Sequence, residues 1–164
     1  MIYVDTSVIV AALDPSDPRR EEAKKTLELH DDKVISELVV AELASVLTKQ
    51  HKVLTNIRDK LGVSEHVALI AIILYIMKRF NLKYTSIEGS SRTPLGRFYK
   101  PLACTIELAE KLRLRTLDLL HLAYVKVMKE QGTWIHTLLT ADVDFKNNEE
   151  NIKKTLGITV NLLK

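Results

Sequence analysis

Four acidic residues in this chain lie within or directly beside apolar runs, where a lone carboxylate is rarely found. They are Asp5, Glu42, Asp118 and Asp142. Taking an ionised carboxylate out of water costs several kcal/mol unless a partner compensates for the lost hydration. Because no matched lysine or arginine stands beside them, the pattern favours a shared cation as that partner. A group of hard oxygen ligands favours Mg²⁺ or Mn²⁺, so the sequence predicts a divalent-metal site.

Strand-like and helix-like segments alternate along the chain. Strands are expected at 1–4, 33–36, 82–86, 134–140 and 158–162, and helices at 6–13, 18–29, 37–50, 64–80, 101–113 and 117–131. Such alternation predicts an α/β fold with a mainly parallel sheet. We expect a single domain over residues 1–164, with a helical and basic-loop segment at about 53–100, since a chain of this length can bury one core.

Capping residues suggest where some of these helices begin. Asp17 is expected to cap the second helix, with Pro18 at its first helical position. Thr116 is expected to cap the helix that carries Asp118, and a short helix is expected to begin near Asp142.

Two of the acids directly follow predicted strands. Asp5 comes after the first strand, and Asp142 comes after the strand at 134–140. Sites in open α/β sheets lie beyond the carboxyl ends of the strands, so the two aspartates would face one crevice if these strands are neighbours. Asp118 would lie in the first turn of its helix, where the helix dipole also favours an anion.

Each acid also has an ordinary structural role that the sequence leaves open. In this alternative, Asp5 and Asp142 serve as helix N-caps, and Asp118 interacts favourably with a helix dipole without binding a metal. Glu42 would be a solvated glutamate or a partner of Lys49. We favour the metal-binding interpretation because the acids recur in apolar surroundings. His121, one turn after Asp118, is interpreted as a partly buried structural histidine.

Composition narrows the class of protein. The single cysteine, Cys104, excludes an internal disulfide and a cysteine-rich zinc site. The longest apolar run, Val67–Met77, has 11 residues, which is too short to span a bilayer. The N-terminus begins directly with a strand-like segment and shows no basic leader, so we expect a cytoplasmic protein that does not bind membranes.

The motifs around the acids resemble those of the PIN-domain nucleases, the family that includes the VapC-type toxins of toxin–antitoxin pairs. Val4–Ile9 and Ser36–Leu43 resemble the first and second acidic motifs, while Leu117–Ala123 and Leu139–Phe145 closely resemble the third and fourth. Their order and spacing fit the whole chain. The family pattern favours Asp142 over Asp144 as the fourth acid and leaves Asp144 beside the site.

This resemblance implies a three-layer fold with a mainly parallel five-stranded sheet, often in the order 3-2-1-4-5, flanked by helices. It also implies metal-dependent hydrolysis of RNA phosphodiester bonds, with Mg²⁺ or Mn²⁺ held by the four acids, and a small antitoxin protein as partner. Thr6, Ser7 and Thr140 would hydrogen-bond the carboxylates or the attacking water, although turn and capping roles are equally open for them. The alternative is a catalytically inactive PIN-like module that binds RNA or acts as a scaffold.

Two further segments suggest contacts with other molecules. The helix Ser64–Phe80 is apolar nearly all round, so we expect it to be buried in the domain or against another chain, in a homodimer or by the antitoxin. Residues 89–97 read as the clearest loop, within a region of positive net charge. Arg92, Arg97 and Lys100 would bind RNA there, or the loop would merely be solvated.

Overall fold

A sheet of five parallel strands forms the centre of the computed structural model, which describes residues 1–29, 32–49 and 51–164. The strands are β1 (Ile2–Val4), β2 (Lys33–Ile35), β3 (Leu82–Tyr84), β6 (Thr137–Thr140) and β7 (Thr159–Leu162). They lie in the order β3-β2-β1-β6-β7, and every neighbouring pair is parallel. The α/β class and the 3-2-1-4-5 order are therefore confirmed, since β6 and β7 are the fourth and fifth strands of this sheet.

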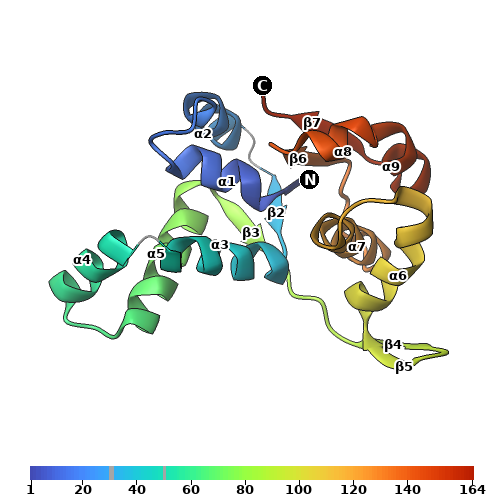
Figure 1. Cartoon of the computed structure of the whole chain (residues 1–164), viewed down its shortest axis with the longest axis horizontal. Coiled ribbons are helices and arrows are strands. Elements are labelled where there is room, and N and C mark those ends of the chain that lie inside the picture. The colour runs from blue at the N-terminus through green and yellow to red at the C-terminus, as the bar shows by residue number, and fades with distance from the viewer. Residues whose placement is uncertain (30–31, 50) are drawn as a thin grey trace.

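Helices cover both faces of the sheet, with α1, α3 and α5 to the left and α6 and α7 to the right in Figure 1. The helices are α1 (Thr6–Leu13), α2 (Arg20–Leu29), α3 (Glu37–Lys49), α4 (His51–Leu61), α5 (Glu65–Arg79), α6 (Lys100–Leu112), α7 (Thr116–Glu130), α8 (Val143–Asn147) and α9 (Glu149–Leu156). Gln50, the expected last residue of the helix at 37–50, lies outside the described residues.

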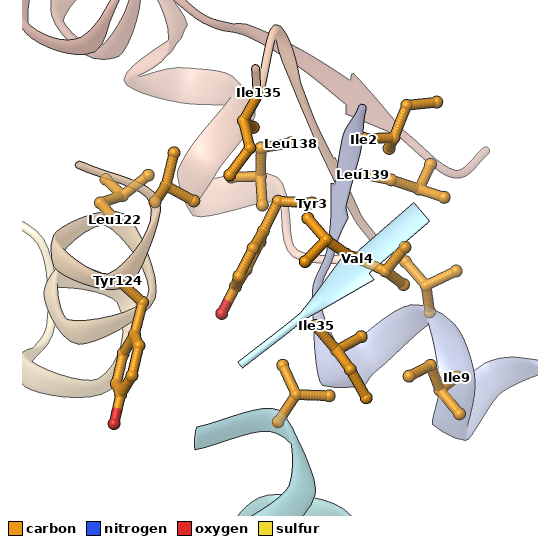
Figure 2. Close-up of a cluster of buried hydrophobic side chains, with 14 of the residues drawn as sticks. Ile2, Tyr3, Val4, Ile9, Ile35, Leu122, Tyr124, Ile135, Leu138 and Leu139 are labelled. Carbon is orange, nitrogen blue, oxygen red and sulfur yellow. The ribbon is translucent and has the colours of Figure 1, made fainter. Parts of the chain in front are cut away.

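The first strand occupies the middle of the core. All three residues of β1 are buried, as expected for a strand with helices on both faces. Figure 2 shows the Tyr3 side chain extending toward Leu122 and Tyr124 of α7, while Ile2 lies on the other side of the strand. Because β1 is fixed on both faces, the residue that follows it is held at a defined position.

Several predicted boundaries were wrong by one to three residues. The second helix begins at Arg20 rather than Pro18, because Asp17 accepts from the backbone N–H and the guanidinium of Arg19 in the turn before it. Thr116 is the first residue of α7, and Arg115 occupies the N-cap position. The strand after α7 begins at Thr137 rather than at 134, since Ile135 N–H bonds to Thr133 in a turn.

The predicted loop at 89–97 was also wrong, because this segment forms a β-hairpin. Its strands β4 (Ser90–Thr93) and β5 (Gly96–Tyr99) pair antiparallel and extend from the lower right of the molecule (Figure 1). The Thr93 hydroxyl accepts from Leu95 N–H and donates to the Gly96 carbonyl, and Gly96 adopts a φ of 126°. A turn-rich sequence thus closes two short strands.

The apolar helix α5 is only partly buried within this chain. Ala68, Ile73 and Ile76 face the core, but a row of large apolar side chains remains in solvent. The exposed residues are Val67, Ile70, Leu74 and Tyr75. In the described chain no single helix is long and apolar enough to cross a membrane; only α4 from Leu54 and α5 taken together would be, and they meet at a bend of 106°.

Candidate metal centre

The first and fourth predicted acids emerge side by side at the carboxyl edge of the sheet. β1 pairs in parallel with β6, with Val4 opposite Leu139, and the Asp5 N–H extends this ladder with a 2.9 Å bond to the Leu139 carbonyl. Asp142 follows β6 after a single intervening residue. The two strands are therefore neighbours, which is the condition under which Asp5 and Asp142 were expected to face one crevice. The boundary between β1 and β6 is also the point where strand order reverses.

Glu42 and Asp118 reach the same region from two helices on opposite sides of the sheet. Glu42 lies in α3, which is separated from β2 by Ser36 alone, and its side chain is partly buried. Asp118 lies in the first turn of α7. A helix that leads into a parallel strand runs back across the sheet, so its N-terminus and positive dipole end lie beside the strands' carboxyl ends.

Asp5 and Glu42 form one group with His121. Their ligand atoms all lie within 4.8 Å of one another. The His121 Nε2 is 3.0 Å from Glu42 Oε2 and 3.4 Å from Asp5 Oδ1, and the residue is 3% exposed. The imidazole therefore links two carboxylates that would otherwise repel each other.

A buried polar chain fixes the other nitrogen of this ring. His121 Nδ1 lies 3.0 Å from the Tyr3 hydroxyl, which is 2.7 Å from Ser36 Oγ. Burial raises the pKa of Tyr3 well above its usual value, so the phenol stays protonated near neutral pH. The ring is thus anchored from the core side, and its Nε2 is directed toward the acids.

The charges within this group shift one another's ionisation. Burial lowers the pKa of His121, but the hydrogen bond to Glu42 and the charges of Asp5 and Glu42 outweigh burial, so the pKa lies above its ordinary value. Burial raises the pKa of Glu42, yet the interactions with His121 and the Thr6 hydroxyl lower it further than burial raises it. Glu42 is therefore held in its ionised form.

Hydroxyl groups orient these carboxylates. Thr6 Oγ1 donates to Glu42 Oε2. Ser7 Oγ and Thr140 Oγ1 both donate to Asp5 Oδ2, at 2.5 Å and 2.7 Å. The same two hydroxyls accept backbone N–H groups, Ser7 from Ala141 and Thr140 from Asp142, each at 3.0 Å. Ser7 and Thr140 thus connect the Asp5 carboxylate to the loop after β6.

Asp118 and Asp142 form a second group with Asp144, and their ligand atoms also lie within 4.8 Å of one another. Asp142 caps α8 and accepts from Asp144 N–H at 2.8 Å, so its expected capping role is present as well. Burial raises the pKa of Asp118, and the charges of Asp142 and Asp5 raise it further. The pKa of Asp118 is thus raised by one acid of each group.

The donor set fits a divalent cation. Asp118 Oδ2 is buried and has no hydrogen-bond partner in the described part of the chain, although it lies among like charges. A buried acceptor in that position is unfavourable unless a cation compensates for its lost hydration. Asp118, Asp142 and Asp144 offer only carboxylate oxygens, the ligands preferred by Mg²⁺ and Mn²⁺, while in the other group His121 Nε2 faces the carboxylates of Asp5 and Glu42.

The predicted RNA-binding residues lie apart from these acids. Arg92 and Arg97 are directly opposite each other on the hairpin, and Lys100 folds against Gly89 at its base. The hairpin joins the body where the Tyr99 ring contacts Tyr124. Tyr124 follows Asp118 by six residues, or about 9 Å along α7.

Three residues near the acids were missed as site residues by the sequence analysis. His121 had a usable signal, since its spacing of three from Asp118 puts both on one helix face. Arg19 donates to the Ala141 carbonyl at 2.9 Å, and Arg115 lies 3.7 Å from Asp144 Oδ2. Neither arginine stands in a pattern that points to the acids, because both contacts are made across the fold.

Comparison with known proteins gives one family. The model of the PIN domain matches residues 2–151. No curated protein matches the sequence.

Solved structures with the same fold share little sequence with this chain. VapC20 of Mycobacterium tuberculosis, described as a sarcin–ricin-loop-cleaving toxin, is 19% identical, with a TM-score of 0.56 over 90% of this chain and 94% of that one. A chain of VapBC2 from Rickettsia felis, solved with a DNA fragment from its promoter, is 18% identical, with a TM-score of 0.54 over 100% of both chains. FitAcB from Neisseria gonorrhoeae is 18% identical, with a TM-score of 0.54 over 98% and 96%. At these identities the likeness concerns the fold.

Proposed function

Because this chain belongs to the PIN domain family, we propose that it is a metal-dependent endoribonuclease and the toxin of a toxin–antitoxin pair. The family model and the VapC-type neighbours support a nuclease of this kind. The observation that carries the metal dependence is the buried Asp118 oxygen, which has no partner in the described chain and lies among other acids.

Asp5, Glu42, Asp118 and Asp142 would hold Mg²⁺ or Mn²⁺. When bound, such a metal neutralises the charge that develops on the phosphate and lowers the pKa of the attacking water. The carboxylates would bind and position the metal, and none of them needs to act as a nucleophile. Thr6, Ser7 and Thr140 keep the oxygens of Asp5 and Glu42 in place, so little reorganisation is needed during the reaction.

His121 would act through these acids. It bonds to Glu42 and lies close to Asp5, and Tyr3 fixes the ring from behind. Its role would be to hold both carboxylates in one orientation and to reduce their repulsion.

We expect an antitoxin as partner and the cytoplasm, where RNA substrates are available, as the place of action. The relatives named VapBC2 and FitAcB support a small protein partner. The exposed face of α5 offers apolar surface for it or for a second copy of this chain. Between α3 and α5 runs a groove of about 410 Å³ that is lined mainly by apolar side chains, among them Val40, Ala44, Leu74 and Met77.

The proposed activity is tested by incubating the purified chain with tRNA and with a ribosomal RNA fragment containing the sarcin–ricin loop. Cleavage of either RNA in Mg²⁺ or Mn²⁺, and its loss in EDTA, is the expected result. Binding without cleavage of any RNA, with either metal, would favour the inactive PIN-like module instead. Cleavage that continues in EDTA would contradict the metal-dependent mechanism.

A further inference from the structure

Arg115 stands at the rim of the second acidic group. It occupies the N-cap position of α7, and its carbonyl accepts from Leu119 N–H at 2.9 Å. The backbone that carries the guanidinium is therefore fixed to the same helical turn as Asp118. The side chain itself is 81% exposed, and its Nη2 lies 3.7 Å from Asp144 Oδ2.

The ion pair between Arg115 and Asp144 is weak enough for another anion to replace Asp144 as the partner of Arg115. At 3.7 Å it exceeds hydrogen-bond length, and the Asp144 carboxylate is itself 37% exposed. Exposed ion pairs of this kind contribute little to the stability of a fold. An incoming anion with good geometry can thus replace Asp144 without a large loss.

Arg19 differs from Arg115 because its guanidinium is already bonded to protein acceptors. Its guanidinium donates to both carboxylate oxygens of Asp17, at 3.1 Å and 2.9 Å, and to the Ala141 carbonyl at 2.9 Å. Arg19 therefore braces the loop before Asp142 and has few donors left. Arg115, with a single ion pair among the described residues, keeps most of its five donors for another molecule.

A phosphodiester that approaches this site meets a concentration of negative charge. Asp118, Asp142 and Asp144 lie within 4.8 Å of one another, and Asp5 is close enough to affect Asp118. A cation at the rim offsets that repulsion, and the planar fork of a guanidinium matches two phosphate oxygens at once.

We propose that Arg115 binds a phosphate of the RNA substrate beside the acidic groups, and that Asp144 holds its guanidinium until the substrate arrives. This inference rests on the proposed ribonuclease function and assigns a substrate-binding residue to it. It also gives Asp144 a role in addition to its place in the second acidic group.

The test compares Arg115→Asn with Arg113→Asn, two variants that lose the same charge two residues apart. Asparagine is a preferred N-cap, so Arg115→Asn keeps the start of α7. Arg113 is exposed and adopts a φ of 51°, a conformation that asparagine tolerates. Neither change should damage the fold, and an unchanged melting temperature and metal-induced shift would verify this.

Two experiments are made: one gives the steady-state KM and kcat for RNA cleavage in Mg²⁺, and the other gives the dissociation constant for the same RNA in Ca²⁺ as a function of salt. Arg115→Asn should raise KM and the dissociation constant by about tenfold, as for a lost charge-assisted hydrogen bond, and leave kcat within about twofold. It should also reduce the log–log salt slope by about 0.7, the value for one phosphate contact on a single strand. Arg113→Asn should change neither quantity, and Arg115→Lys should restore part of the affinity.

Equal behaviour of the two asparagine variants would overturn the inference. A fall in kcat with unchanged KM in Arg115→Asn would overturn it too, because the residue would then act on the chemistry rather than on binding. If the wild type binds RNA but cleaves none, the proposed function fails, and the dissociation constants alone decide whether Arg115 binds the phosphate.

Discussion

His121 Nε2 lies 3.0 Å from Glu42 Oε2, at the point where two acids would otherwise face each other without a cation. The opposite ring nitrogen is held by Tyr3, whose hydroxyl also contacts Ser36. A line of contacts therefore runs from the buried centre of the sheet to the acids. It explains how Asp5 and Glu42 can stay close together in the absence of metal.

The first prediction concerns His121→Gln, which keeps an N–H donor but cannot become charged. The pKa of folded His121 lies above its ordinary value of about 6.5. Its protonation therefore stabilises the fold fully below that value, and this contribution disappears as pH rises through the raised pKa. In EDTA, wild type should unfold at higher urea than His121→Gln near pH 5.5, and the gap should narrow toward pH 9.

The control for this experiment is His66→Gln, which changes an exposed histidine of α5. It should leave stability unchanged at each pH. A gap between wild type and His121→Gln that widens with rising pH would contradict the account of His121.

The second prediction concerns Asp118→Asn and Asp5→Asn. Since burial and like charges disfavour the ionised Asp118, the asparagine variant should melt at a higher temperature than wild type in EDTA. Mg²⁺ or Mn²⁺ should stabilise the wild type by about 2.7 kcal/mol at roughly a hundredfold excess over its dissociation constant. Both variants should lose most of that shift, as measured by thermal unfolding.

Asp59→Asn is the matched control, because Asp59 is an exposed acid of α4 that pairs with Arg58. It should respond to metal as the wild type does. If Asp118→Asn and Asp5→Asn did so too, the shared metal site would be wrong.

The sequence could predict the sheet and the placement of Asp5 and Asp142 at the same sheet edge, because both depend on local patterns. An apolar strand followed by an acid occurs twice, and parallel strands bring their carboxyl ends to one edge. The hydroxyls of Thr6 and Ser7 follow from the same argument, since both directly follow Asp5.

Other features depend on tertiary contacts that no local pattern reports. The sequence of the hairpin predicts a loop because its glycines, serines and proline are turn residues, whereas its strand pairing places Arg92 opposite Arg97. The composition of α5 is apolar on every side, so the sequence predicts burial but not which side faces the core and which side faces a partner. Which side faces the core depends on where α3 and α4 pack, and that leaves Leu74 and Tyr75 in solvent.

The third prediction concerns Leu74→Glu on the exposed face of α5. Leu74 is 59% exposed, so the change should cost little stability in the isolated chain. It should weaken binding of a second copy or of the antitoxin, because a charge would enter an apolar interface. Sedimentation velocity of the chain alone measures self-association, and sedimentation velocity with its candidate antitoxin measures binding of that partner.

Leu95→Glu provides the comparison, since Leu95 is 79% exposed at the tip of the hairpin. It should leave association intact. A wild type that stays monomeric and captures no small partner, or equal behaviour of the two glutamate variants, would count against the α5 interface.

The fourth prediction concerns the double variant Arg92→Ala, Arg97→Ala. The two arginines face each other across the hairpin, so removing them relieves repulsion and should not destabilise it. If both contact phosphates, RNA affinity should fall and the log–log salt slope should decrease by about 1.4, or roughly 0.7 for each contact. Cleavage at saturating RNA should survive.

Lys153→Ala with Lys154→Ala removes the same charge from the exposed side of α9 and serves as the control. Filter binding at several salt concentrations compares the two. Equal slopes would mean that the hairpin is a solvated feature without RNA contacts.

The most direct test of the central claim is single-turnover cleavage of tRNA by wild type and by Asp142→Asn, with Mg²⁺ and with EDTA. Asparagine can still cap α8, so the variant should fold normally. The account predicts cleavage by wild type in Mg²⁺ alone, none by Asp142→Asn, and RNA binding by the variant that is equal or slightly tighter because one negative charge is gone. Cleavage by Asp142→Asn at the wild-type rate, or by wild type in EDTA, would contradict it.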